Sequence, residues 1–97
     1  MTISDLEKLI KSNLENKTQE FKRVFLGRGN FFESFNFLTV DSIDNILYVC
    51  FFDEIEDSLE KEIIALIDKL YEEFSFEVLV LQRRYLQSSP CEVLKGE

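Results

Sequence analysis

The sequence predicts an α+β domain: a small, mixed, four-stranded sheet in the chain order α-β-β-β-α-β, with a helix packed on one face. Residues 58–74 carry apolar side chains at the period of a helix. Four short runs rich in aromatic and β-branched residues read as strands, and the last of them follows that helix. A helix that connects two strands of a sheet packs across one of its faces.

Composition sets the class of protein. The chain has 97 residues, is 45% hydrophobic and contains ten phenylalanines, which is enough apolar volume for one core. Its net charge of −8 argues against nucleic-acid binding by the domain as a whole, although a local basic patch remains open. There is no histidine, so the commonest general base and zinc ligand are missing.

Location follows from what the chain lacks. No charged segment followed by an apolar stretch opens the sequence, and no apolar run is long enough to span a bilayer. We therefore expect a cytoplasmic protein with no membrane partner. Cys50 and Cys91 are expected to be free thiols.

The N-terminal segment predicts a helix over about residues 5–14. Ser4 and Glu7 have the spacing of a capping box, and apolar residues follow at helical spacing. We assign residues 1–20 to this helix and its connector, and residues 21–97 to a β-β-β-α-β domain.

The first three strands are expected at residues 21–26, 37–41 and 46–52. Glycine and asparagine in residues 27–30 end the first one, and turn formers between the other two predict an antiparallel hairpin. The continuous apolar run of residues 46–52 predicts a strand that is buried on both faces.

The helix of residues 58–74 is followed by a last strand at residues 77–81, after which the chain is polar as far as Val93. The expected core residues are Val24, Leu26, Leu38, Val40, Leu47, Val49, Phe51, Ile63, Leu66, Ile67, Leu70, Val78 and Val80.

Two candidate sites have plain structural readings. Gly27 and Gly29 suit a turn better than a phosphate loop, because no helix is expected directly behind them. The acidic residues near strand ends suit turns and a helix start better than a magnesium site. We assign no catalytic, cofactor-binding or metal-binding residue. The carboxylates considered are Asp41, Asp44, Asp53 and Glu54.

A group of arginines remains. Arg28 follows the first expected strand, and Arg83, Arg84 and Tyr85 follow the last one. Guanidinium groups beside a tyrosine can contact phosphates and stack on a base. They can equally pair with the domain's carboxylates or with a neighbouring domain. We assign these four residues to RNA or interdomain contact.

Several segments occur in an order that resembles a known family. They are Gly27-Arg28-Gly29, Leu38-Thr39-Val40-Asp41, the run from Leu47 to Phe52, Leu81-Gln82-Arg83-Arg84-Tyr85-Leu86 and Ser89 to Glu97. The order resembles the domain that precedes the catalytic domain in class I S-adenosylmethionine (SAM)-dependent methyltransferases related to the bacterial large-subunit ribosomal RNA cytosine methyltransferases. The resemblance covers about residues 22–97.

The resemblance implies a non-catalytic, substrate-orienting domain. Its partners would be a downstream methyltransferase domain and ribosomal RNA. The 97 residues match neither the family's glycine-rich cofactor loop nor its aspartate-proline-proline segment. We therefore expect no cofactor in this chain, SAM in the missing catalytic domain, and no enzymatic activity from this chain alone.

The alternative is a stand-alone protein-interaction module. It would form a homodimer through an exposed strand edge or through the aromatic residues Phe31, Phe32 and Phe35.

Overall fold

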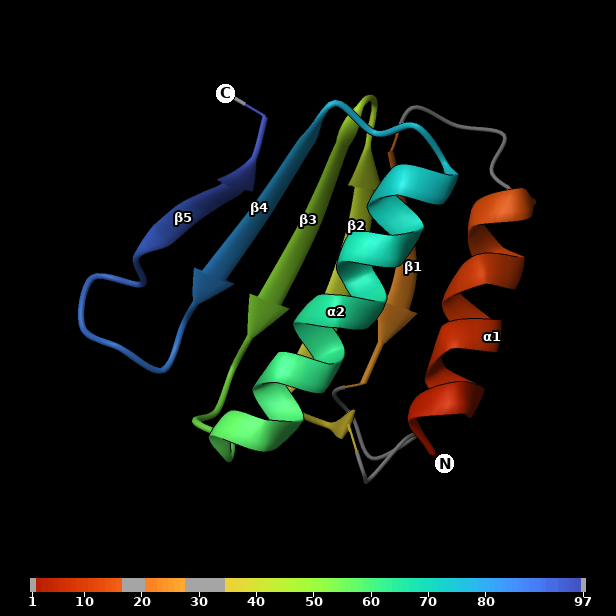
Figure 1. Ribbon diagram of the computed structural model, residues 1–97. Coiled ribbons are helices and arrows are strands. Elements are labelled where there is room, and N and C mark those ends of the chain that lie inside the picture. Colours follow the sequence, from red (N-terminus) through yellow and green to blue (C-terminus); the bar gives the residue numbers. More distant parts are fainter. Residues whose placement is uncertain (1, 17–20, 28–34, 97) are drawn as a thin grey trace.

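The computed structural model describes residues 2–16, 21–27 and 35–96. These residues form two helices and a five-stranded sheet (Figure 1). In chain order the elements are α1 (Ile3–Glu15), β1 (Phe21–Leu26), β2 (Leu38–Ile43), β3 (Ile46–Phe51), α2 (Asp57–Glu73), β4 (Val78–Arg83) and β5 (Cys91–Lys95).

The sheet confirms the mixed α+β class and corrects the number of strands. Its order is β1-β2-β3-β4-β5, and only the pair β3–β4 is parallel. The sequence predicted four strands and missed β5, which pairs antiparallel with β4 at the edge of the sheet. β5 has only five residues, and its polar and apolar residues give too weak an alternation to predict a strand.

Both helices lie on the same face of the sheet (Figure 1). α1 and α2 run in the same direction, and two ion pairs join them: Lys69 Nζ lies 2.8 Å from Glu7, and Lys11 Nζ lies 2.9 Å from Glu73. These pairs are largely exposed and contribute little stability. The helices are held mainly by apolar side chains directed at the sheet.

α1 begins earlier than expected because a different residue caps it. The Asp5 amide donates to Thr2 Oγ1 over 3.1 Å, and the Thr2 amide donates to Asp5 Oδ2 over 2.9 Å. This is a capping box around Thr2, so the prediction of a box around Ser4 was wrong. The hydrogen bonds with Thr2 lower the pKa of Asp5.

The core lies between the helices and the sheet. Ten of the thirteen expected core residues are buried there, and α1 adds Leu6, Ile10 and Leu14 to the same cluster. The predictions for Leu26, Val78 and Val80 were wrong. In β4 the aliphatic residues alternate between the two faces, and the helices cover Leu79 and Leu81 instead.

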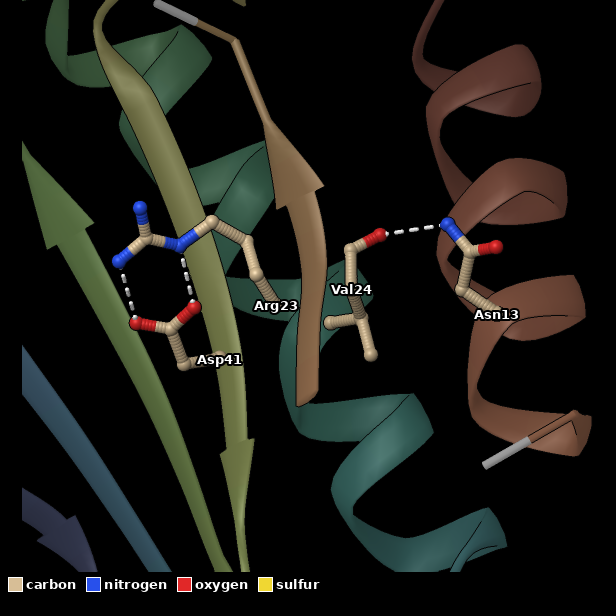
Figure 2. Close-up of polar contacts among 4 residues, drawn as sticks. All are labelled: Asn13, Arg23, Val24 and Asp41. Atoms are coloured by element: carbon tan, nitrogen blue, oxygen red, sulfur yellow. Dashed lines mark hydrogen bonds and ion pairs between the residues drawn. The ribbon is translucent and has the colours of Figure 1, made fainter. Parts of the chain in front are cut away.

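A bulge explains the error at Leu26. Val24 is an extra residue between the pairs Arg23–Asp41 and Phe25–Val40, so the side-chain alternation of β1 shifts there. Val24 and Phe25 are both buried, and Leu26 is 41% exposed. The Asn13 side chain of α1 donates to the carbonyl oxygen of Val24 over 2.7 Å (Figure 2).

Candidate functional site

The strands that precede the candidate arginines end on the same side of the sheet. β2 is antiparallel to both β1 and β3, and β3 is parallel to β4, so β1, β3 and β4 run the same way and end on the same side (Figure 1). Arg28 follows β1 but lies outside the described residues. Arg83 is the last residue of β4 rather than the first residue after it, and Arg84 and Tyr85 follow.

Arg83 is held by the domain's own carboxylates. Its guanidinium lies 3.3 Å from Glu60 of α2 and 3.1 Å from Glu92 of β5, and the side chain is 24% exposed. Burial lowers the pKa of Arg83, but the hydrogen bond to Glu92 and the charge of Glu60 outweigh it and raise the pKa overall. Arg83 therefore ties β4 to α2 and β5.

Tyr85 packs against the core as a partly buried residue. Because its side chain packs against the core, Tyr85 is not free to stack on a base beside Arg84.

Of the two arginines of this group that the structure describes, Arg84 is the exposed one. Its amide donates to the Phe51 carbonyl oxygen over 2.8 Å, and its guanidinium carbon lies 5.5 Å from the centre of the Phe52 ring. This distance is within the range of a cation–π interaction. Among the described residues no carboxylate pairs with Arg84.

We call the face of the sheet that lies opposite the helices the open face. Strand alternation and the register assign its residues. They are Phe21, Arg23, Leu26, Thr39, Asp41, Ile43, Ile46, Tyr48, Cys50, Val78, Val80, Gln82, Cys91 and Val93, with Phe52 and Arg84 at one end.

The open face is mostly apolar but stands apart from the core. Ile43, Ile46, Val78 and Val80 are half-buried, and none of them belongs to the hydrophobic cluster under the helices. Val93 is 48% exposed. The predicted burial of the third strand on both faces is confirmed in part, because Cys50 on the open face is 3% exposed, while Ile46 and Tyr48 on the same face are half-buried.

A buried carboxylate on the open face is neutralised locally. Arg23 Nε and Nη2 donate to the two oxygens of Asp41 over 2.8 and 3.2 Å, across the strands β1 and β2 (Figure 2). The Asp41 side chain is 9% exposed. The hydrogen bond to Asp41 raises the pKa of Arg23. This pair leaves no net charge in the middle of the face.

Next to this pair is a small polar group. The Tyr48 hydroxyl donates to the Gln82 side chain and lies 3.6 Å from Cys91 Sγ. Burial and the hydrogen bond with Cys91 raise the pKa of Tyr48 to about 12. Burial also raises the pKa of Cys50, so this thiol is not activated as a nucleophile.

The helix side has one hollow of about 360 Å³ between α2 and the strands β4 and β5. Its floor is apolar, from Ile64, Leu79 and Leu94, and charged residues of α2 and β5 form its rim. Lys95 on this rim is already paired with Asp68 and Glu72 at 2.6 and 3.2 Å.

Within residues 2–16, 21–27 and 35–96, no group of three or more metal-ligating side chains is placed to hold a metal ion. None of the helices in these ranges is long and apolar enough to cross a membrane. The open face has the groups needed to bind a partner: rows of aliphatic side chains, the guanidinium of Arg84 and several hydrogen-bonding side chains.

Comparison with known proteins gives a fold relationship. No family model matches the chain, and no curated protein matches its sequence. One similar solved structure is described as "a putative sam-dependent methyltransferase from Streptococcus mutans"; it has a TM-score of 0.68 and 17% identity, over 100% of this chain and 26% of that one. A second is SMU.776, described as "a putative methyltransferase complexed with SAH", with a TM-score of 0.67 and 17% identity, over 100% of this chain and 25% of that one.

These values show a shared fold. The chain spans about a quarter of the length of either structure, and all of it lies within the matched region. The fold is therefore one that also occurs as a segment of larger chains described as methyltransferases.

Proposed function

We propose that this chain is a non-catalytic, substrate-orienting accessory domain of a SAM-dependent methyltransferase. In this proposal a separate catalytic domain binds SAM, and the whole acts in the cytoplasm on RNA, with ribosomal RNA as the substrate that the resemblance implies. The observation that supports it best is the fold relationship, which extends over 100% of this chain and about a quarter of two larger chains described as methyltransferases.

An accessory role requires only binding from this domain. Among the described residues no group of three or more metal-ligating side chains is placed to hold a metal ion, and burial raises the pKa of the Cys50 thiol. Orienting a substrate needs only a surface that binds it, because positioning alone can contribute to catalysis.

For the RNA contact we propose Arg84, together with Arg28 if its side chain reaches the same end of the sheet. Arg84 is exposed and has no carboxylate partner among the described residues, so its charge is available to a phosphate. Arg83 and Tyr85 act indirectly, since the first is paired with Glu60 and Glu92 and the second packs on the core.

A salt titration with ribosomal RNA fragments tests this assignment. Replacing Arg84 with alanine should weaken binding and reduce the slope of log affinity against log salt by about 1, as expected for the loss of one phosphate contact. Arg83→Ala is the matched neighbour and should leave that slope unchanged. If wild-type protein does not bind RNA, or if Arg84→Ala binds as wild type does, the RNA role is wrong.

The accessory role has its own test. Isothermal titration of the chain with SAM should give no binding, because in this proposal the cofactor site belongs to another domain. Tight binding of SAM, or methyl transfer by the chain alone, would contradict it.

A second candidate function is a protein-interaction module, and the open face favours it. The aliphatic rows of this face are more typical of a surface that packs against protein than of one that binds only phosphates.

A further inference from the structure

The open face resembles the inner face of one sheet of a β-sandwich. It contains aliphatic residues from β2, β3, β4 and β5, and neither helix covers it (Figure 1). Phe21 and Leu26 of β1 extend it with exposed fractions of 51% and 41%. Apolar sheet faces are normally buried against a second layer.

We propose that a second copy of this chain docks on the open face, sheet against sheet, with the strands of the two copies running in opposite directions. The resulting homodimer would be a β-sandwich with the helices of both copies outside. The proposal concerns a different surface from the strand edge and the phenylalanine segment considered in the sequence.

The distribution of charge favours this partner. The chain has a net charge of −8, so two copies repel each other over most of their surfaces. On the open face the carboxylate within the strands is Asp41, and Arg23 neutralises it. Arg84 then makes this the least acidic side, and it is the side on which two copies can approach.

The position of Arg84 at the end of β4 favours one direction. Arg84 follows Arg83, the last residue of this strand. A two-fold axis that lies between the sheets and perpendicular to the strands places β4 of one copy on β4 of the other with opposite direction. The two Arg84 side chains then lie at opposite ends of the interface, whereas strands running the same way would place both of these charges at the same end.

The size of the face predicts a weak dimer. Five strands of about six residues span about 24 × 20 Å at the usual spacings, or about 480 Å² of flat area. A standard interface buries about 800 Å² of accessible surface on each partner. The face is therefore smaller than a standard interface, and the expected dimer is a weak one.

Sedimentation equilibrium of the full chain, from micromolar to millimolar concentration, tests the proposal. Wild-type protein should show a monomer–dimer equilibrium. Val93→Glu and Arg84→Glu should each raise the dissociation constant by at least about tenfold, since the first adds a charge on the edge strand β5 of the interface and the second reverses a charge at the end of β4. Both residues are exposed, so neither change removes a core contact, and circular dichroism checks the fold.

Ala65→Glu is the matched control. It adds the same charge on the exposed side of α2, beside the hollow, and should leave the dimer unchanged.

Three results would overturn the proposal: a wild-type monomer at millimolar concentration, a dimer unaffected by Val93→Glu and Arg84→Glu, or a dimer lost in Ala65→Glu. The outcome is independent of the methyltransferase proposal, since the experiment contains neither RNA nor SAM. A monomer that binds RNA through Arg84 would reject the dimer and keep the RNA role.

Discussion

The two faces of the sheet differ in what packs against them. On the helix face, Leu79 and Leu81 of β4 are 1% exposed and belong to a core that includes both helices. On the open face, Val78 and Val80 of the same strand are half-buried and contact no covering element among the described helices. Adjacent residues of β4 therefore serve different ends: one set stabilises the fold, and the other is available for binding.

The arginine pair shows the same division. Arg83 points to the helix face and is held by two carboxylates, while Arg84 is exposed over Phe52. Sequence position alone would give these neighbours the same role, but strand alternation gives them opposite surroundings.

The largest expected effect compares Leu81 with Val80. Leu81→Ala removes a fully buried side chain and should lower the free energy of unfolding by about 2–5 kcal/mol. Val80→Ala should cost about 1 kcal/mol or less in dilute protein, because the side chain is already partly in solvent. Urea denaturation at low protein concentration measures both. Equal losses would mean that the open face belongs to the core.

A smaller effect is expected at the arginines. Arg83→Ala breaks the contacts with Glu60 and Glu92 and should cost about 1 kcal/mol, whereas Arg84→Ala should stay within about 0.5 kcal/mol. Arg83→Lys keeps the charge but cannot reach two carboxylates in the same way, so an intermediate loss is expected. Thermal unfolding distinguishes the three variants, and a larger loss in Arg84→Ala than in Arg83→Ala would reverse the assignment.

The smallest effect is a pH dependence on the open face. The pKa of Tyr48 is raised from 10.0 to about 12, so the folded state favours the neutral phenol. This contribution to stability is present below pH 10.0 and is lost as the pH rises toward about 12.

The comparison of wild type with Tyr48→Phe isolates this group. The advantage of wild-type protein should be constant below the ordinary pKa of tyrosine and should shrink above it. Phenolate absorbance gives an independent measurement, because the tyrosine that ionises at the highest pH should be missing in the variant. A constant difference up to pH 12 would show that Tyr48 does not titrate with folding.

Much of the fold could be predicted because its main elements have strong periodic patterns. The helix α2 and the hairpin strands β2 and β3 begin and end within one or two residues of the predicted ranges. β5 was missed because the five residues of an edge strand need little apolar character. The predicted burial of Val78 and Val80 in β4 was wrong. Valine and leucine alternate in this strand, and only the position of the helices decides which of the two sets is buried.

The candidate site was predicted less well, for a related reason. The four residues were grouped by sequence, but Arg83 and Arg84 lie on opposite faces and Tyr85 turns toward the core. The open face was missed altogether, although the unbroken apolar run of residues 46–52 contained a signal for it. That run suggested burial on two sides; the helices cover one side, and on the other side Cys50 is buried while Ile46 and Tyr48 are half-buried.

The bulges at Val24 and Leu94 limit how far such molecules can assemble. Each interrupts the pairing of an outermost strand, and strands with this irregularity are poor templates for another strand. Lateral growth into a continuous ribbon is thereby discouraged on both sides. In the proposed dimer, stacking through one self-complementary face uses up that face, so association would close at two copies and would not continue into a fibre.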